Sequence, residues 1–240
     1  MVSPECWGIA GNPISHSPTP RMFSIVGESM GFESNHMYIE SSSIEDFLTQ
    51  VSEIKGDIWI SITSPLKHSA PSGLGIKSPV GVYALNQLKR SAGHWSGTNT
   101  DGCGFISACR HIGVEPSFAT LRIRGGGSAA RSIAAAWSSE GGSIIAEDGR
   151  RPLLNGPWGG SMLHSGQADL AVDLDATPAG GRSVDLEGEI QVSVSYDENA
   201  SKDDFAVIML AAQHLRAWES LFLPSRADEL PTLEEFLSKL

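Results

Sequence analysis

The stretch TLRIRGGGSAARS, residues 120–132, decides the fold because it joins three local signals in a fixed order. TLRIR is a short apolar run typical of a strand, three glycines follow, and the alanine-rich continuation is typical of a helix. Gly125, Gly127 and Ala130 fit the pattern GxGxxA, in which the glycines allow a tight turn and a close approach to a pyrophosphate. The helix N-terminus would then face the phosphates. A purely structural turn is the alternative, and the order of strand, turn and helix favours a dinucleotide site.

The rest of the chain repeats this alternation. Short apolar runs bounded by Gly, Pro, Ser or Asp predict strands at 36–41, 57–63, 120–125, 143–148 and 169–176. Helical patterns occupy 42–54, 128–141 and 202–222, and capping boxes are expected at Ser42 to Glu45 and, for a final short helix, at Thr232 to Glu235. Alternating strands and helices predict βαβ units with a parallel sheet, and therefore an α/β fold.

The end of the strand at 143–148 carries signals for two different cofactors. Glu147 or Asp148 stands where a dinucleotide fold places the acceptor for the adenosine ribose hydroxyls of NAD. Arg150 and Arg151 follow at once and would suit the 2′-phosphate of NADP. A solvated turn is a third interpretation of the two arginines.

Three further segments place polar side chains beside predicted elements. GNPISHSPTP (11–20) sets hydroxyl residues on alternate positions from Ser15 to Thr19, SITSPLKHSA (61–70) contains Lys67, and SGTNTDGCGF (96–105) contains Asp101. Each has a structural interpretation, since Asp101 or Thr100 can cap the following helix and Lys67 can be a solvated lysine after a proline turn. Their occurrence together, in this order, favours a functional one.

Composition restricts the class of protein. The 240 residues are 40% hydrophobic and 19% charged, with no apolar run of membrane-spanning length, and the formal net charge of −11 disfavours nucleic acid and anionic membrane as partners. The start of the chain lacks a secretory signal pattern, so the cytoplasm is expected. Three cysteines without a CxxC pair indicate neither a disulfide framework nor a metal site.

Taken in order, these motifs resemble those of the shikimate dehydrogenase family. GNPISHSPTP matches the family's GNPIxHSxSP, SITSPLK matches VTxPxK, GVYALNQL matches GAxN at Asn86, and residues 99–104 match NTDxxG. The glycine-rich turn, the ATP segment at 176–178 and an MLxxQ motif ending at Gln213 complete the order. The resemblance covers nearly the whole chain.

The resemblance implies an α/β protein with an N-terminal α/β substrate domain, a Rossmann-like dinucleotide-binding domain and an active-site cleft between them. Residues 1–100, joined by C-terminal helices at 205–240, would form the first domain, and residues 101–204 the second. The implied activity is the reversible NADP-dependent reduction of 3-dehydroshikimate to shikimate in aromatic amino acid (chorismate) biosynthesis, by a monomer or homodimer. A quinate/shikimate dehydrogenase that uses NAD and a non-catalytic shikimate-binding relative are the alternatives.

Site residues follow from the resemblance position by position. Lys67 and Asp101 match the family's catalytic pair. The implied substrate-binding residues are Ser17, Thr19, Thr63, Asn86, Asn99, Tyr196 and Gln213. The implied cofactor-binding residues are Gly125, Gly126, Gly127, Ser128, Ala129, Asp148, Arg150, Arg151 and Thr177.

The chain also departs from the family pattern. Thr19 replaces a serine, Phe23 and Ser24 replace a His-Asn pair, and Ser61 replaces an asparagine. The turn reads GGGSAA instead of GAGGAA, and an Asn-Arg-Thr signature is missing after the second strand of the cofactor domain. Substrate and cofactor preference are therefore where this chain is expected to differ.

Overall fold

The computed structural model describes residues 3–15, 17–176, 181, 185–196 and 200–240. The chain forms two compact units: residues 1–79, 83–100 and 214–240 make the first, and residues 80–82 and 101–213 make the second. The chain passes from the second unit to the first inside α6 (Phe205–Ala217). The helices expected to join the substrate domain therefore divide, since residues 205–213 pack in the second unit and only 214–240 in the first.

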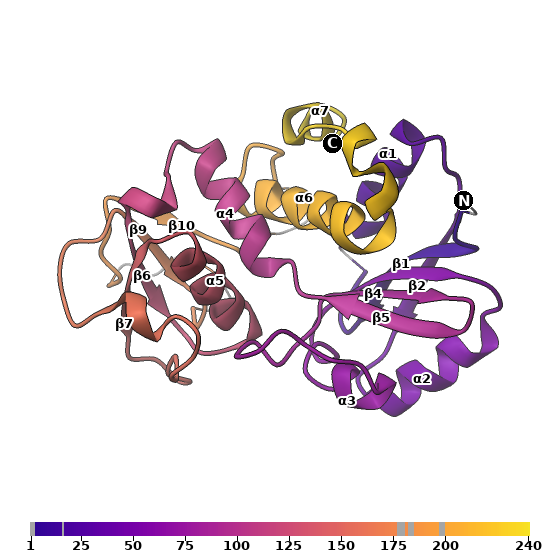
Figure 1. Cartoon of the computed structure of the whole chain (residues 1–240), viewed down its shortest axis with the longest axis horizontal. Helices are drawn as coiled ribbons and strands as arrows, with labels where there is room; N and C mark the ends of the chain where they lie inside the picture. Colours follow the sequence, from indigo (N-terminus) through magenta and orange to yellow (C-terminus); the bar gives the residue numbers. More distant parts are fainter. Residues whose placement is uncertain (1–2, 16, 177–180, 182–184, 197–199) are drawn as a thin grey trace. The chain divides into compact units, whose positions relative to one another are not determined.

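The first unit is built on a five-stranded sheet with the order β2-β1-β3-β4-β5 (Figure 1). Its strands are β1 (Cys6–Gly11), β2 (Asn35–Glu40), β3 (Ile58–Ile62), β4 (Gln87–Ser91) and β5 (His94–Thr98). β1 pairs in parallel with β2 and β3, whereas β4 and β5 form an antiparallel hairpin at one edge. The expectation of a parallel sheet is therefore wrong for this hairpin, which lacks a β-branched run in its sequence and was not predicted as strands.

Helices cover both faces of this sheet (Figure 1). Successive side chains of β3 point to opposite faces of the sheet. On one face, Ile58, Ile60 and Ile62 pack in a core with Phe47 of α2 (Ile44–Glu53), near the short α3 (Ala70–Leu74). Trp59 faces the other way, toward α1 (Thr19–Ser29) and the C-terminal segment. There it contacts Trp218 at 5.0 Å and Phe222 at 5.1 Å between ring centroids. Aromatic pairs of this kind contribute about 0.5–1.5 kcal/mol beyond the apolar area that they bury.

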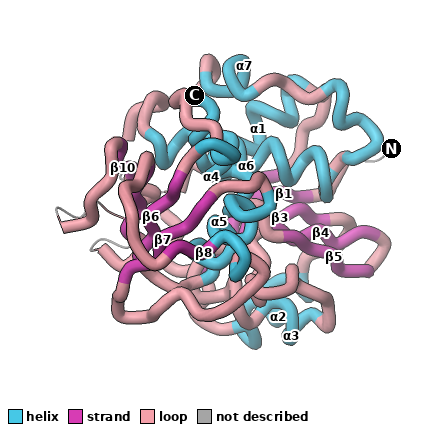
Figure 2. Tube along the Cα trace, turned by 60° about the vertical axis from the view of Figure 1, so that its left-hand side comes forward, coloured by secondary structure: helices cyan, strands magenta, loops and turns pink. Residues whose placement is uncertain are grey.

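The second unit contains a five-stranded, wholly parallel sheet with the order β10-β9-β6-β7-β8. Its strands are β6 (Thr120–Arg124), β7 (Ser143–Glu147), β8 (Met162–Leu163), β9 (Leu170–Asp173) and β10 (Ile190–Val192). Numbered by their own sequence, they run 5-4-1-2-3 or, from the other edge, 3-2-1-4-5, which is the order of the first five strands of a six-stranded Rossmann sheet. Figure 2 shows this sheet with α5 (Ser128–Ser139) beside it. The expected Rossmann-like fold is confirmed.

Small residues allow the helices of this unit to pack closely. A Cβ atom at Gly102, in α4 (Asp101–His111), would lie 2.2 Å from the backbone oxygen of Ser132 in α5. The Ser132 hydroxyl also accepts a hydrogen bond from the Gly102 N–H at 2.8 Å. Between β7 and β8 the chain forms an irregular loop with a short 3₁₀ turn (Gly159–Ser161) in place of a further helix.

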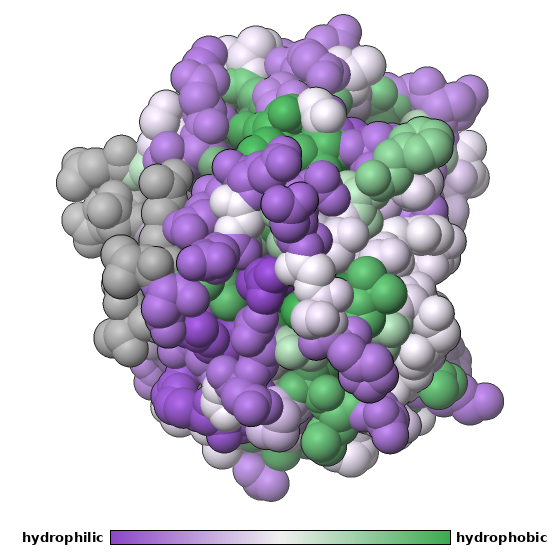
Figure 3. All heavy atoms as spheres, turned by 90° about the vertical axis from the view of Figure 1, so that its left-hand side faces the viewer, coloured by the Kyte–Doolittle hydropathy of each residue, from purple (hydrophilic) through white to green (hydrophobic). Residues whose placement is uncertain are grey.

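The second unit's visible surface is mainly hydrophilic where it is described, and hydrophobic residues interrupt it in separate places (Figure 3). A helix that combines the length and apolar character needed to cross a bilayer is absent from the described part of the chain.

Local details correct two expectations. The N-cap of α2 is Ser43, whose hydroxyl accepts from the Asp46 N–H, and not Ser42 as the capping pattern predicted. The capping box from Thr232 to Glu235 at α7 (Leu233–Leu237) is confirmed. The predicted helix at 202–222 begins later, at Phe205, and its last five residues form a π-helical turn (Trp218–Phe222).

Candidate active site

The predicted substrate residues of the first unit emerge at one edge of its sheet. β1, β3 and β5 end there and β4 begins there, because Ala10 lies opposite Ile62 and Gln87 lies opposite both Ser61 and Thr98. Backbone hydrogen bonds continue the sheet past the strands, from the Thr63 N–H to the Ala10 oxygen (2.9 Å) and from the Asn12 N–H to the Ser64 oxygen (2.9 Å). The loop after β1, the segment after β3 and the ends of the hairpin therefore lie next to one another.

Lys67 is held on a short turn after β3. The turn closes with a hydrogen bond from the Leu66 N–H to the Thr63 oxygen at 2.9 Å, and Leu66 is buried. The Lys67 backbone oxygen accepts from the Leu85 N–H at 2.9 Å, which ties the turn to the segment before β4. Thr63 and Lys67 are both half-buried. The backbone of Lys67 is therefore fixed, and its side chain is partly accessible to a ligand.

The hydroxyl groups of Ser17 and Thr19 lie at the start of α1, and both are already engaged. The Thr19 N–H donates to the Ser17 hydroxyl at 3.3 Å. The Thr19 hydroxyl lies 3.2 Å from Nε2 of His214, on α6, and Thr19 is 1% exposed. Ser17 is half-buried. The two hydroxyls thus have fixed positions in the loop that the resemblance assigns to substrate binding.

The two predicted asparagines connect the hairpin to neighbouring segments. Asn86 is 2% exposed, and its side-chain oxygen accepts from the Thr100 N–H at 2.8 Å while its side-chain nitrogen donates to the Thr100 hydroxyl at 3.1 Å. Asn99 is half-buried and donates to the Ala84 oxygen at 3.3 Å. Asn86 therefore fixes the residue that immediately precedes Asp101, in addition to any contact with a ligand.

Three predicted residues belong to the second unit. Asp101 is the first residue of α4 and is 2% exposed. Gln213 is 8% exposed on α6, where it packs so closely on α4 that a Cβ at Gly104 would lie 2.4 Å from its Cγ. Tyr196 is half-buried after β10. Lys67 and Asp101 thus come from different units, and their action as a pair is a proposal.

The glycine-rich turn has the geometry that its sequence pattern predicts. Gly125 follows β6 with φ +111°, a backbone conformation that favours glycine. Gly127 is the N-cap of α5, and a Cβ added there would meet no described atom within 4 Å, apart from its chain neighbours. Ala130 is fully buried under the turn. No side chain of the described residues caps the N-terminus of α5, so its first N–H groups suit an anion.

Gly126 has a different reason to be glycine. A Cβ at this position would lie 2.1 Å from the backbone oxygen of Pro152 and 2.9 Å from that of Arg151. The loop after β7 therefore packs its main chain against the glycine-rich turn. The Arg131 guanidinium also holds the turn. It donates to the Gly126 oxygen at 2.8 Å and to the Val82 oxygen at 2.8 and 3.0 Å.

The structure separates the two acidic candidates at the end of β7. Glu147 forms a salt bridge with Arg122 of β6, whereas Asp148 is exposed. Arg150 is also exposed, with a distant contact of 3.8 Å to the Asp175 carboxylate. The exposed Arg151 donates its backbone N–H to the same carboxylate at 3.4 Å. Of the predicted cofactor residues, Ser128 and Ala129 begin α5, and Thr177 lies outside the described residues.

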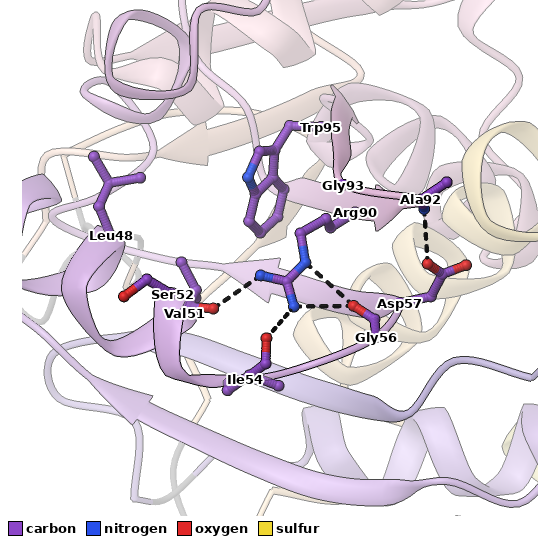
Figure 4. Close-up of a pocket in the computed structure, with 10 residues that line it drawn as sticks. All are labelled: Leu48, Val51, Ser52, Ile54, Gly56, Asp57, Arg90, Ala92, Gly93 and Trp95. Atoms are coloured by element: carbon purple, nitrogen blue, oxygen red, sulfur yellow. Dashed lines mark hydrogen bonds between the residues drawn. The ribbon is translucent and has the colours of Figure 1, made fainter.

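A hollow of about 460 Å³ in the first unit lies elsewhere, between α2 and the β4–β5 hairpin (Figure 4). Its only guanidinium, Arg90, is occupied by the main chain. It donates to the backbone oxygens of Val51 (2.8 Å), Ile54 (2.5 Å) and Gly56 (2.9 and 3.3 Å) and lies 5.7 Å from the Trp95 ring. Arg90 therefore ends α2 and fixes the following loop, and the hollow is not the predicted site.

Sequence reasoning missed His214 and Ser132. Each acts through a contact between helices that are distant in sequence, His214 with Thr19 and Ser132 with Gly102. No local pattern marks such a contact. A buried histidine beside Gln213 looks like any other helix residue.

Comparison with known proteins agrees with this description. The chain is 33% identical over 149 residues to the NADP-dependent shikimate dehydrogenase of Syntrophomonas wolfei, a match that covers 60% of this chain and 50% of that protein. The same enzyme of Halobacterium salinarum is 27% identical over 215 residues, 85% of this chain and 78% of that protein. Thus the chain spans about half the length of the first curated relatives that it matches. No model of a protein family matches the sequence.

The fold has a solved counterpart. The crystal structure of shikimate 5-dehydrogenase from Thermus thermophilus, in complex with NADP(H) and shikimate, superposes with a TM-score of 0.77, at 22% identity, over 98% of this chain and 97% of that one. At this identity the superposition shows the fold. Together, sequence similarity and fold confirm that this chain resembles the shikimate dehydrogenase family and has its two-domain α/β architecture.

Proposed function

We propose that the protein is an NADP-dependent shikimate dehydrogenase, which interconverts shikimate and 3-dehydroshikimate. The observation that carries the proposal is the polar edge of the first unit's sheet, where Ser17, Thr63 and Lys67 emerge from segments tied together by backbone hydrogen bonds. Hydroxyl and amide groups suit a ring with several hydroxyls and a carboxylate, since they donate and accept. The relatives named for this activity support the same substrate.

Lys67 is the proposed acid and base. In the oxidation, the substrate C–H bond releases hydride and its hydroxyl releases a proton, which the Lys67 amine accepts; in the reduction the ammonium returns it. The ammonium also stabilises negative charge that develops on the substrate oxygen. Asp101 is proposed to bind the same hydroxyl, and Asn86 fixes Asp101 from the preceding residue through its bonds to Thr100. Gln213, Asn99 and Tyr196 are proposed to bind the remaining polar groups.

The residues of the second unit fit a bound dinucleotide, which would supply the hydride acceptor. Backbone N–H groups at the start of α5 and the open space beside Gly127 suit its pyrophosphate. Asp148 is proposed to accept from the ribose. Arg150 and Arg151 are proposed to bind the 2′-phosphate of NADP, and Thr177, which lies outside the described residues, is proposed as a further cofactor-binding residue. The proposal thus assigns the cofactor to the second unit, whereas the substrate-binding residues come from both: Asp101, Gln213 and Tyr196 belong to the second unit and the others to the first.

The test is the change in nicotinamide absorbance with purified protein and shikimate, run with NADP and with NAD. We expect turnover that is faster with NADP and that falls by roughly 10²–10⁴-fold in Lys67→Ala. Lys55→Ala, which removes an exposed lysine, is the matched control and should retain wild-type turnover. Faster reaction with quinate and NAD would replace the proposal by the quinate/shikimate alternative. Calorimetric binding of shikimate without turnover would indicate a binding protein.

A further inference from the structure

Thr19 and His214 form a buried polar pair that the proposed mechanism does not yet use. The Thr19 hydroxyl oxygen lies 3.2 Å from Nε2 of the imidazole, and the two residues are 1% and 0% exposed. Both belong to the first unit. Two hydrogen-bonding groups withdrawn from water in this way hold each other in one orientation.

Apolar rings fix the imidazole in place. Thr19 and Phe23 are one turn apart on α1 and therefore share a face of that helix. The Phe23 ring meets the His214 ring edge-on, with centroids 5.1 Å apart. Trp218 lies one turn beyond His214 and contacts Phe23 at 6.3 Å. The histidine thus has little freedom except in the placement of its proton.

The surroundings decide which nitrogen carries that proton. Nδ1 of His214 is buried and has no hydrogen-bond partner among the described residues. A proton on Nδ1 would therefore be a buried donor without an acceptor, which is more costly than an unused lone pair. A proton on Nε2 points at the Thr19 oxygen instead. Burial also lowers the pKa of His214 to about 3, so the ring is neutral and carries one N–H.

With this tautomer, both hydroxyls of the loop become donors. The Thr19 oxygen accepts from Nε2, and the Ser17 oxygen accepts from the Thr19 backbone N–H at 3.3 Å. Each hydroxyl proton then remains for another acceptor. A pair of O–H donors suits a carboxylate, whose oxygens only accept.

We propose that His214 is a positioning residue, which donates to Thr19 and thereby directs the Thr19 hydroxyl proton toward the carboxylate of the substrate. The inference rests on the proposed function, since it names what one part of that site does. Thr19 and Phe23 both depart from the family pattern, and both contact His214. The contact with His214 therefore lies where this chain differs from the family.

The test compares His214→Leu, which removes the donor, with His214→Gln, whose amide N–H can take the place of Nε2–H. We expect His214→Leu to raise the KM for shikimate roughly tenfold with little change in kcat, and His214→Gln to restore most of the loss. The methyl ester of shikimate, which lacks the carboxylate charge, should show a much smaller effect. His36→Gln is the matched control. His36 also pairs with a hydroxyl of α1, that of Ser24 at 2.5 Å, but this pair is exposed.

The assignment would be overturned if wild type and His214→Leu had the same KM for shikimate. It would also be overturned if His214→Leu raised the KM for shikimate and for its methyl ester by the same factor. Nitrogen-15 spectra of labelled histidine give an answer independent of activity: the proton must be on Nε2, and a proton on Nδ1 refutes the proposal. If His214→Leu fails to fold, the spectra of the wild type still decide the position of the proton, and with it the proposal. Wild-type protein that neither binds nor oxidises shikimate would refute the proposed function itself, whereas active wild type with unaffected variants refutes only the role of His214.

Discussion

Acidification should destabilise the first unit through His214 alone by a measurable amount. The imidazole is fully buried, and the loss of hydration lowers its pKa from 6.5 to about 3. In the unfolded chain the ring regains its ordinary pKa and binds a proton below about pH 6.5. Because the unfolded state then holds more protons than the folded state, stability is present above about pH 6.5 and is lost as the pH falls toward the folded pKa.

The size of the effect follows from the two pKa values. Within the window, one group costs about 1.4 kcal/mol of unfolding free energy per pH unit. From about pH 7.5 to about pH 5, the protonation of His214 in the unfolded state therefore removes about 2 kcal/mol. That is a large part of the stability of an ordinary domain.

The assay is urea unfolding followed by tryptophan fluorescence at the two pH values, for wild type and His214→Gln. Trp7, Trp59 and Trp218 lie in the same unit as His214, so they report on its unfolding. Asp57, whose pKa is lowered by hydrogen bonds from Ser91 and Ala92, titrates below this window and is common to both proteins. The variant should lose about 2 kcal/mol less than wild type on acidification. An equal loss in both proteins would refute the claim that His214 is held neutral by burial.

Other changes test the packing around the site. Gly126→Ala places a Cβ 2.1 Å from the Pro152 oxygen, so it should cost about 1–3 kcal/mol in urea unfolding and weaken NADP binding in calorimetry; unchanged affinity would contradict the role of the loop after β7. Ser132→Ala leaves the Gly102 N–H buried without an acceptor and should lower the free energy of unfolding by about 1–3 kcal/mol in the same assay. An unchanged free energy of unfolding would contradict this and would mean that water replaces the hydroxyl. Arg90→Met leaves three backbone oxygens without their donor and should lower the melting temperature without changing the KM for shikimate; a changed KM would place the hollow beside α2 in the site after all.

The cofactor fold was predictable because its signal is local. A strand, a glycine-rich turn and an alanine-rich helix stand next to one another in residues 120–132, and each is set by the conformational preferences of its own residues. Gly125 adopts a positive φ, and Ala130 is fully buried. β3, β7 and β9 also followed from short apolar runs, which are typical of strands in the interior of a parallel sheet, whereas the short strands β8 and β10 were not predicted.

What was not predictable depends on contacts across the sequence. The β4–β5 hairpin contains Lys89 and Arg90, whose side chains contact distant segments: Lys89 donates to the Leu221 and Phe222 oxygens, and Arg90 donates to the Val51 oxygen at the end of α2. Glu147 and Asp148 were equivalent candidates until the pairing of β6 with β7 placed Arg122 beside Glu147. These outcomes are decided by which strands become neighbours, and no single segment encodes that.

One departure from the family pattern in the cofactor unit, glycine at position 126, has its physical cause in the loop after β7. The loop after β7 replaces a helix and lies with its main chain against the glycine-rich turn, which excludes a side chain at Gly126 and explains glycine where the family pattern has alanine. The same loop needs glycine at 149, since a Cβ there would lie 2.4 Å from the Asp175 carboxylate. That close approach keeps Arg150 and Arg151 next to the turn, each in contact with Asp175. The proposed contact of these arginines with the 2′-phosphate of NADP would therefore be made from a loop that is packed on the glycine-rich turn, without the missing Asn-Arg-Thr signature.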